Sequence, residues 1–464
     1  MEAFNVAVLG GGPGGYTAAI RVAQLGAAVC LVEMDKVGGT CLNRGCIPTK
    51  ALLTCAEVLA HIKHAEEYGV EVTQIKPSFA RMVERKDKIV ANLISGVGFL
   101  LKSYGVTVLK GRGVLTAKDK VWVEGCNGGG VELQADKIII ATGSRPALIP
   151  AFNIDGKKII TSNEALNLKE LPESIIIVGG GVIGCEFACI FSELGVKVTI
   201  LELLPNILPT EDKVIGQRLR LILKKRGVEI LNQSQITRIE VQGDKVVASL
   251  EGKEPVSADM ALISIGRSMN TEDIGLREMG IAQGRRGEIL VDDKMETNVH
   301  GIYAIGDVVG KIMLAHVAAK QGLIAAANAM GGNASMNYSL VPSCIFTSPE
   351  IGSVGLTADK AKEQGFDVTL GNFSFMALGK AQAMGQTEGT VRLVVDVKTD
   401  KILGAQIMGP HATDLIAEVT LAIKMGATAH QISETIHAHP TLAEAIFEAS
   451  EDVHDVAIHA AKKK

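Results

Sequence analysis

The sequence is poor in aromatic residues, in cysteine and in long apolar runs, and each shortage excludes a class of protein. Only 4% of the 464 residues are aromatic and only 8 are cysteine. Cysteines this sparse do not make the disulfide framework of a small secreted protein, so a disulfide here is more typically catalytic than structural. No uninterrupted apolar run reaches the roughly 18 residues of a membrane span, and the N-terminus lacks the basic start of a secretory signal. We therefore expect a cytoplasmic protein without a membrane partner.

Charge of one sign is also lacking. The chain has 47 Lys and Arg against 51 Asp and Glu, a net charge of −4. This balance gives no sequence-wide attraction for nucleic acid, which we do not expect as a partner. Glycine, in contrast, is abundant, with 51 residues. Many glycines and few aromatics favour an α/β fold with tight turns between strands and helices, and the length predicts about three domains.

A strand, glycine turn, helix and second strand occur twice. The first set covers residues 5–9, 10–15, 16–25 and 28–33, and the second covers 174–178, 179–184, 185–194 and 197–202. Both turns match Gly-x-Gly-x-x-Gly, with Gly10, Gly12 and Gly15 in the first and Gly179, Gly181 and Gly184 in the second. Each second strand ends in an acid, Glu33 or Glu202. Such glycines admit a pyrophosphate, the helix N-terminus stabilises its charge and the acid binds the ribose, so the pattern predicts two dinucleotide sites.

Later apolar segments extend this organisation. Strands at 137–141 and 259–265 run into Thr142-Gly143 and Gly266-Arg267, which we interpret as the exits of the first and second nucleotide units. Segments 289–292 and 301–307 predict one more buried strand, ending in Asp307. After residue 342, strands at 391–397 and 402–408 and the following helices predict a separate domain. A helix beginning near Thr441 places one apolar face inward, and the terminal lysines form a solvated tail. That face consists of Leu442, Ala445, Ile446, Ala449 and Val453.

Cys41 and Cys46 lie directly downstream of the first fingerprint. On a straight helix, a rise of about 1.5 Å per residue would place their Cα atoms beyond the roughly 7 Å limit of a disulfide. The segment must therefore bend, and Gly45 and Pro48 favour a distorted start to the next helix. We interpret the two as a redox pair, with two reduced core cysteines as the alternative. The other six are expected in the core and not as metal ligands: Cys30, Cys55, Cys126, Cys185, Cys189 and Cys344.

These motifs, together with the run His437-Ala438-His439-Pro440-Thr441, resemble the pyridine nucleotide-disulphide oxidoreductases over essentially the whole chain. The resemblance implies two Rossmann-like dinucleotide-binding domains, residues 1–147 for FAD and 148–267 for NAD. It also implies a central domain, 268–342, that completes the FAD site, and a C-terminal α+β dimerisation domain, 343–464, that forms a homodimer.

The resemblance also implies residue roles. Glu33 would bind the FAD ribose and Asp307 the ribityl side, while Thr142, Gly143, Gly266 and Ala315 would lie near the cofactors. Lys50 would lie near the flavin and pair with Glu186. Thr49 and Met269 stand where many members have Ser and Pro. Glu202 followed by Leu203, Leu204, Pro205 and Asn206, without Arg, predicts NAD and not NADP, which argues against a glutathione reductase.

Thiol chemistry requires a base, because an unperturbed cysteine is mostly protonated at neutral pH. The resemblance implies His439 as this base, supplied by the other subunit and oriented by Glu444. Thr441-x-x-Glu444 is also a capping box, and both can hold together. We expect a structural role for His437.

The implied reaction is oxidation of dihydrolipoamide by NAD⁺ through FAD. Cys41 would exchange with the substrate and Cys46 would face the flavin. No lipoyl domain precedes the first strand, so the lipoylated partner protein would act in trans. A mercuric reductase, which usually ends in vicinal cysteines, fits less well, because this chain ends in Ala-Ala-Lys-Lys-Lys. A flavin-holding scaffold without turnover is the alternative from another class, and the intact Cys41, Cys46, His439 and Glu444 argue against it.

Overall fold

The computed structural model describes residues 2–125 and 128–461. These residues form two compact units. Unit 1 consists of Met1–Cys55, Lys76–Leu171 and Leu262–Asn337, and unit 2 of Ala56–Ile75, Pro172–Ala261 and Tyr338–Lys464. The expected boundaries after residues 147, 267 and 342 are finer than this division and stay predictions. Cys126, expected in the core, and the lysine tail, expected in solvent, lie outside the described residues.

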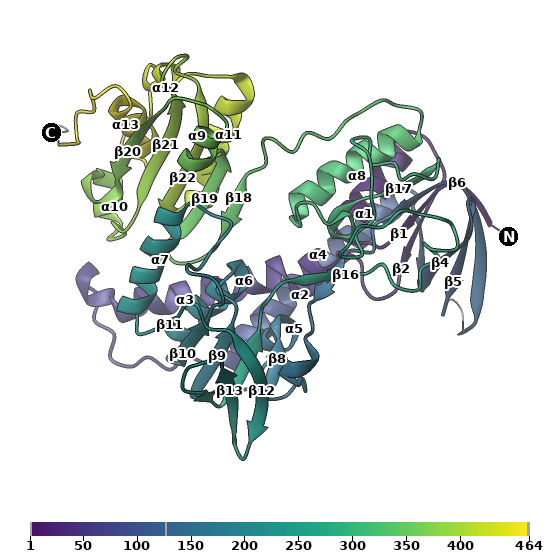
Figure 1. Cartoon of the computed structure of the whole chain (residues 1–464), viewed down its shortest axis with the longest axis horizontal. Coiled ribbons are helices and arrows are strands. Elements are labelled where there is room, and N and C mark those ends of the chain that lie inside the picture. The colour runs from purple at the N-terminus through teal and green to yellow at the C-terminus, as the bar shows by residue number, and fades with distance from the viewer. Residues whose placement is uncertain (1, 126–127, 462–464) are drawn as a thin grey trace. The chain divides into compact units, whose positions relative to one another are not determined.

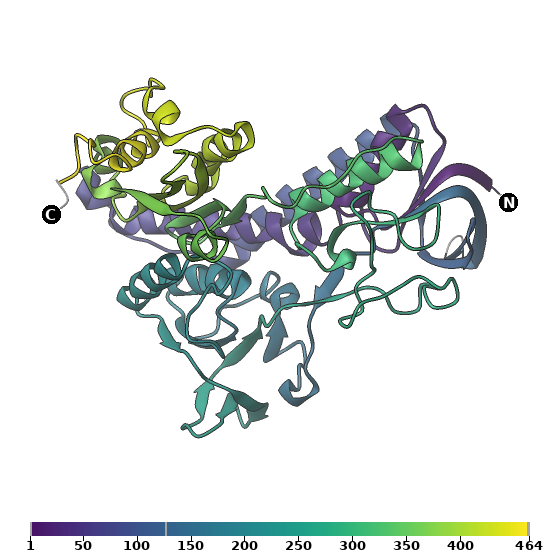
Figure 2. The same cartoon turned by 45° about the horizontal axis from the view of Figure 1, so that its top comes forward.

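Unit 1 is built on a mixed sheet in the order β3-β2-β1-β6-β5-β4, and β17 also pairs with β6. The pairs β1–β2, β2–β3, β1–β6 and β6–β17 are parallel, whereas β4, β5 and β6 pair antiparallel. The bounds are β1 Glu2–Leu9, β2 Val29–Glu33, β3 Thr107–Lys110, β4 Arg112–Ala117, β5 Lys120–Glu124, β6 Gly130–Ile140 and β17 Ile302–Ala304. In Figure 2 the antiparallel strands appear as the blue ribbon near the N-terminus.

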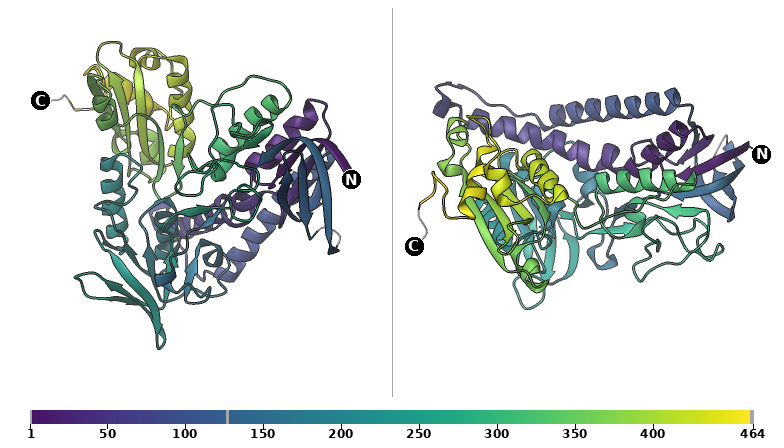
Figure 3. Two further views of the ribbon diagram at one scale, coloured as in Figure 1. Left: turned by 45° about the vertical axis from the view of Figure 1, so that its right-hand side comes forward. Right: turned by 90° about the horizontal axis from the view of Figure 1, so that it is seen from above.

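Four helices of unit 1 position the first nucleotide turn and the residues after it. Helices α1 and α8 pack closely, because Gly14 and Gly322 let their backbones approach: a Cβ on Gly322 would lie 2.5 Å from the Gly14 carbonyl oxygen. Helix α4 is long and unbroken (Figure 3). The bounds are α1 Pro13–Gln24, α2 Gly39–Arg44, α4 Phe79–Ser103 and α8 Ala315–Ala329. Helix α3, Cys46–Lys63, begins in unit 1 and ends in unit 2.

Short elements complete unit 1. Strands β7 and β16 pair antiparallel, with Met269 opposite Ser144. Met269, which stands where many members of the family have Pro, therefore ends a short strand. Segment 289–292 is not a strand, contrary to the prediction, and contributes an isolated bridge between Ile289 and Gln283. The bounds are β7 Ser144–Pro146, η3 Pro150–Phe152, β8 Ile159–Thr161, α5 Ser162–Ala165, β16 Arg267–Met269 and η4 Gly306–Val309.

Unit 2 repeats the nucleotide-binding pattern. Strands β9, β10 and β11 are parallel neighbours, and β12, β13 and β14 form an antiparallel sheet. The bounds are η1 Ala65–Tyr68, β9 Ser174–Val178, α6 Val182–Glu193, β10 Lys197–Leu201, α7 Lys213–Lys225, β11 Glu229–Leu231, β12 Ile236–Gln242, β13 Lys245–Leu250 and β14 Val256–Ala258. Strand β15, Met260–Ile263, crosses from unit 2 back to unit 1. The elements predicted for this second nucleotide unit are thus confirmed to within a few residues at their ends.

The C-terminal part of unit 2 is an antiparallel sheet in the order β18-β19-β22-β21-β20. Helix α11 packs on β19 and β22, and α13 packs on β20 and β21. The bounds are β18 Ser343–Ile345, β19 Glu350–Gly355, α9 Ala358–Glu363, β20 Val368–Ser374, η5 Phe375–Ala377, α10 Gly379–Ala383, β21 Thr390–Asp396, β22 Ile402–Gly409, α11 Ala412–Met425, α12 Ala429–Ser433 and α13 Glu444–Asp452.

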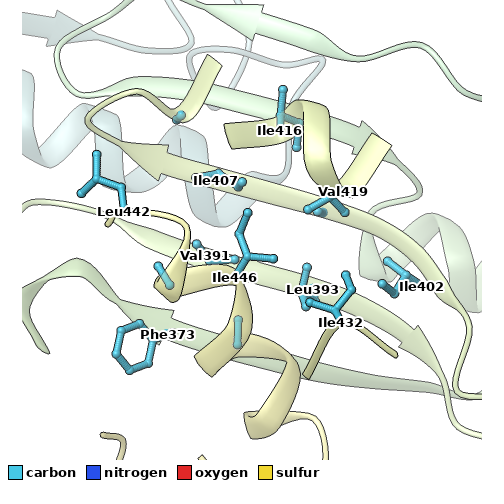
Figure 4. Packing of buried hydrophobic residues seen from close by; sticks show 14 of the residues in the cluster. Phe373, Val391, Leu393, Ile402, Ile407, Ile416, Val419, Ile432, Leu442 and Ile446 are labelled. Atoms are coloured by element: carbon cyan, nitrogen blue, oxygen red, sulfur yellow. The ribbon is translucent and has the colours of Figure 1, made fainter. Parts of the chain in front are cut away.

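The core of this sheet includes the apolar face predicted after Thr441. Figure 4 shows Leu442 and Ile446 among the isoleucine, leucine and valine side chains that the strands contribute. All five predicted residues are buried, although α13 begins at Glu444 and not near Thr441. Burying one such side chain stabilises the fold by about 1.5–3 kcal/mol, so the segment that carries His439 and Glu444 is fixed to a well-packed core. None of the described helices combines the length and apolar character of a membrane span.

Candidate functional site

The first fingerprint folds as a tight turn in front of α1. Gly10 has a φ of +106°, and a Cβ on Gly15 would lie 1.8 Å from the Gly10 carbonyl oxygen, so both positions require glycine. Glu33 closes the turn, because its carboxylate accepts the Gly11 amide at 2.7 Å and the Asp35 amide at 2.8 Å. Burial raises the pKa of Glu33, against the lowering effect of the Gly11 amide. The turn thus presents helix N-terminal amides beside a positioned acid.

The second fingerprint has the same geometry in unit 2. Gly179 has a φ of +101°, and the Glu202 carboxylate accepts the Gly180 amide at 2.5 Å and the Leu204 amide at 2.7 Å. A side chain on Gly181 would meet open space. Glu202 is 6% exposed. A carboxylate at the end of this strand binds the ribose 2′-hydroxyl and repels a 2′-phosphate. The exposed side chains of Leu203 and Leu204 follow it and carry no charge.

The predicted bend between the two thiols is confirmed. Helix α2 ends at Arg44 and α3 begins at Cys46, while Gly45 between them adopts a φ of −140° and a ψ of −115°. The hydroxyl of Thr49 donates to the Gly45 carbonyl oxygen at 2.6 Å, so threonine supplies the hydroxyl at this position. The break brings the sulfur of Cys41 within hydrogen-bond distance of that of Cys46.

The thiol segment is attached to the first nucleotide turn. The Gly38 amide donates to the Gly11 carbonyl oxygen at 2.7 Å. Gly39, with a φ of +55°, approaches so closely that a Cβ there would lie 2.6 Å from the Gly12 Cα. The backbone just before the two thiols is therefore in direct contact with the turn that is predicted to bind the cofactor.

The thiol of Cys41 keeps its proton more tightly than an ordinary cysteine. The pKa of Cys41 is raised, first by its hydrogen bond to Cys46, then by burial and by the charge of Cys46, while Lys50 acts in the opposite direction. The thiolate of Cys41 is therefore disfavoured. Cys46 is the more exposed of the two, and exposure alone would favour Cys46 as the sulfur that meets the substrate. The raised pKa of Cys41 favours the opposite assignment, with Cys41 as the sulfur that meets the substrate. The division of roles stays a prediction.

Sequence reasoning missed a polar cluster beside the thiols. The Ser144 hydroxyl bonds to the Asp307 carboxylate, and Arg267 donates from Nε to the Ser144 Oγ at 2.7 Å and from Nη2 to the Ser144 carbonyl oxygen at 2.8 Å. Burial lowers the pKa of Arg267, and the charges of Asp307 and Cys46 oppose that shift. The Gly306 amide donates to Gln321 of α8 at 2.7 Å, which fixes the turn that carries Asp307. Arg267 was visible in the sequence as the residue after Gly266, but nothing local marked its partner.

The other predicted residues of unit 1 occupy turns around this cluster. The Thr142 hydroxyl donates to the Asn270 carbonyl oxygen at 2.7 Å, and Gly143, with a φ of +71°, accepts the Asn270 amide. Gly266, with a φ of +120°, accepts the Ala147 amide, and Ala315 begins α8.

In unit 2, Glu186 is buried and accepts the Phe346 amide at 3.0 Å. Lys50 belongs to unit 1, and its pairing with Glu186 stays a prediction.

The predicted histidine and glutamate of the base lie together in unit 2. His439 Nδ1 lies 2.8 Å from Glu444 Oε1, and the other carboxylate oxygen accepts the Thr441 amide at 2.8 Å. Burial alone would raise the pKa of Glu444, but these two bonds outweigh it and the pKa is lowered. The Thr441 hydroxyl donates to Ala438, and Thr441 is not the N-cap of α13, so only half of the predicted capping box forms. The His439 side chain is 76% exposed, which leaves Nε2 accessible.

His437 has the structural role expected of it. Its side chain is 7% exposed, Nδ1 lies 2.8 Å from the Thr435 carbonyl oxygen and Nε2 lies 2.9 Å from Glu418. The ring also packs on Phe447. Both nitrogens are thus occupied, and neither can serve as a base for a substrate.

Of the remaining cysteines, Cys30, Cys185 and Cys189 are buried as predicted, whereas Cys55 and Cys344 are only partly buried. The expectation of a core position was therefore too strong for these two. Cys344 lies on the edge strand β18 and packs against the core from there, whereas Cys55 lies on α3. Across the described ranges, no group of three or more His, Cys, Asp or Glu side chains could hold a metal ion.

Two nucleotide turns, one joined to a bent dithiol segment, define a dinucleotide-dependent disulfide oxidoreductase. The chain belongs to the pyridine nucleotide-disulphide oxidoreductase family, which matches residues 4–322, and the dimerisation domain of that family matches residues 341–450. The dimerisation domain supports a homodimer.

Two relatives and two solved structures show the extent of the similarity. Dihydrolipoyl dehydrogenases of Bacillus subtilis and Chlamydia trachomatis are each 44% identical, covering 98% and 99% of this chain and 99% and 98% of their own. The crystal structure of LpdA from Mycobacterium tuberculosis is 28% identical, with a TM-score of 0.91 over 97% of this chain and 99% of that one. The HOCl-induced flavoprotein disulfide reductase RclA from Escherichia coli is 30% identical, with a TM-score of 0.86 over 96% and 98%.

Proposed function

We propose that this chain is a dihydrolipoyl dehydrogenase, which oxidises dihydrolipoamide to lipoamide with NAD⁺ through FAD and the Cys41–Cys46 pair. The observation that carries the proposal is the contact between the two sulfurs across the break at Gly45, on a segment attached to the first nucleotide turn. The 44% identity to dihydrolipoyl dehydrogenases over nearly the whole chain supports the choice of substrate.

The residues present fit both cofactors. The first turn combines glycines that leave no side chain over the N-terminus of α1 with Glu33 for a ribose, and Asp307 for the ribityl side lies in the same unit. The second turn offers the same groups, and Glu202 favours a free 2′-hydroxyl and therefore NAD. FAD, when bound, takes two electrons from the thiols and delivers them to NAD⁺ as hydride.

The thiol chemistry begins with a base. His439 would accept a proton from a dihydrolipoamide thiol at Nε2, because Nδ1 is held by Glu444. The resulting thiolate attacks the Cys41 sulfur of the oxidised pair, so the Cys41–Cys46 bond breaks, a mixed disulfide forms and Cys46 leaves as a thiolate. The second substrate thiol then displaces Cys41 and closes lipoamide. Arg267 faces the charge that develops on Cys46.

The proposal includes the source of the base and of the substrate. We propose that His439 completes the site of the second subunit, which its 76% exposed side chain in the single chain supports. The lipoyl group would be presented in trans by a lipoylated protein of a multienzyme complex. A pair that cycles between thiols and disulfide suits a reducing compartment, which supports a cytoplasmic location.

The test is NAD⁺ reduction by dihydrolipoamide with the purified, FAD-loaded protein. Turnover is expected, and its absence despite bound FAD would favour the flavin-holding scaffold and refute the proposal. The variant Cys41→Ser should keep FAD and oxidise NADH with an artificial acceptor, while it loses dihydrolipoamide oxidation. Loss of FAD from this variant would instead mean that the pair is structural. A pull-down of lipoylated proteins then identifies the partner.

A further inference from the structure

A second histidine and glutamate lie on the same helix as the proposed base pair. Helix α13 begins at Glu444 and carries Glu448 one turn later, and residues four apart on a helix are neighbours on one face. Glu448 is engaged by the C-terminal segment: His459 Nδ1 lies 2.5 Å from Glu448 Oε1, and the His459 amide donates to Oε2 at 3.2 Å. Neither residue was singled out from the sequence.

The two members of this pair differ sharply in burial. The Glu448 side chain is 5% exposed and that of His459 is 68% exposed. A buried carboxylate is costly unless it is paired and hydrogen-bonded, and His459 supplies donors to both of its oxygens. The pKa of His459 is raised, first by its hydrogen bond to Glu448 and then by the charge of that carboxylate, with a smaller effect of Glu444.

The Glu448–His459 pair therefore affects the electrostatic environment of Glu444. An unpaired Glu448 anion one turn away would disfavour the Glu444 anion, which His439 requires as its acceptor. The groups that act on Glu444 are His439, the Thr441 amide and His459. The two remaining acids of the same helix are Glu451 and Asp452, and Asp452 accepts the Asn372 amide at 2.8 Å. His437 is paired with Glu418.

We propose that His459 is a positioning residue for the His439–Glu444 pair, and that it acts by neutralising Glu448. The inference rests on the proposed function, because it assigns His459 to the base of dihydrolipoamide oxidation. Its chemical content is electrostatic. The His459 cation compensates the charge of the Glu448 carboxylate, so the net charge beside Glu444 stays near zero. Proton uptake by the His439–Glu444 pair therefore stays outside the working pH range.

The experiment follows the acid limb of the pH profile, the loss of dihydrolipoamide oxidation as pH falls, in the FAD-loaded dimer. His459→Gln removes the cation, which favours proton uptake, and should move the acid limb to higher pH by about half a pH unit. Glu448→Gln removes the anion and should move it in the opposite direction. The double variant Glu448→Gln/His459→Gln should return close to the unmodified protein, which loss of packing alone would not produce.

His454→Gln is the matched control, because His454 pairs with Asp400 at 2.9 Å in the same part of the chain and is not among the groups that shift the pKa of Glu444. This variant should leave the profile unchanged. NADH oxidation by an artificial acceptor does not use His439 and should stay constant in all four variants.

The proposal is wrong if the two single variants move the acid limb in the same direction, or if neither moves it. If His459→Gln does not fold, a shift to lower pH in Glu448→Gln still tests the idea. Failure of the unmodified protein to oxidise dihydrolipoamide would refute the proposed function itself, which separates the two outcomes.

Discussion

Replacing Gly39 by alanine tests whether the contact between the thiol segment and the first nucleotide turn holds the site together. The new Cβ would lie 2.6 Å from the Gly12 Cα, and neither atom can move away by a side-chain rotation, because the Cβ is fixed to its own backbone and the Cα is part of one. The variant must therefore move the thiol segment, the turn or both. We expect a folded protein that binds FAD weakly and has little dihydrolipoamide activity.

The magnitude has two parts. A left-handed conformation costs a residue with a side chain roughly 1–2 kcal/mol, and forcing an extra carbon into a packed site costs about 1–3 kcal/mol more. Gly26 supplies the matched control, because it has a φ of +86° in the same unit but nothing within 4 Å of its added Cβ. Gly26→Ala therefore incurs only the first part. The two variants should differ by about 1–3 kcal/mol, which corresponds to roughly a tenfold to hundredfold loss of FAD affinity.

The assay is FAD retention on dialysis together with thermal unfolding, with dihydrolipoamide oxidation measured after FAD is added back. Gly39→Ala should lose FAD at concentrations where Gly26→Ala retains it. Equal FAD affinity and equal unfolding temperature in the two variants would refute the argument, because the steric contact would then contribute nothing.

Three further predictions concern the base, the second nucleotide turn and a surface carboxylate. His439→Gln should reduce dihydrolipoamide oxidation about 10²- to 10⁴-fold while NADH oxidation by an artificial acceptor is retained, and equal loss of both activities would contradict the assigned base. Glu202→Gln weakens the acceptor for the ribose and for the Gly180 amide, so kcat/KM for NAD⁺ should fall about tenfold; an unchanged value would show that the acid does not contact the nucleotide. The pKa of Asp259 is lowered, first by Lys245 and then by Ser174, so its stabilisation is present above the ordinary aspartate pKa and is lost as pH falls through the folded one. Asp259→Asn should therefore reduce the fall in the free energy of unfolding between pH 6 and pH 3 by less than about 1 kcal/mol, and an unchanged fall would contradict this.

Local features were predictable from the sequence because their causes are local. The glycine turns, the acids at the ends of β2 and β10 and the bend at Gly45 each depend on a few neighbouring residues. The adjacency of His439 and Glu444 was carried by the family resemblance and not by spacing. The apolar face from Leu442 to Val453 was correct as a face, although the helix starts later because the Glu444 side chain bonds the Thr441 amide.

The missed features depend on residues that are far apart in the sequence. Arg267 meets Ser144 because β7 and β16 pair across more than a hundred residues, and no periodicity encodes that partner. His459 reaches Glu448 through the segment that follows α13, and no motif in the sequence marked this pair. Segment 289–292 is apolar enough for a strand but forms an isolated bridge with Gln283 and no continuous ladder among the described residues, so its apolar character did not imply a strand.

The two nucleotide turns also differ in what is attached to them. In the first turn, the carbonyl oxygen of the second glycine, Gly11, accepts the Gly38 amide and so anchors the dithiol segment. In the second turn, the corresponding carbonyl oxygen of Gly180 accepts the Leu208 amide at 2.8 Å. The carbonyl at the second glycine of each turn therefore anchors a different segment: the dithiol segment in unit 1 and the segment that follows β10 in unit 2. Because the bond to the dithiol segment joins two backbone atoms, that segment is tied to its nucleotide turn without using any side chain of the turn.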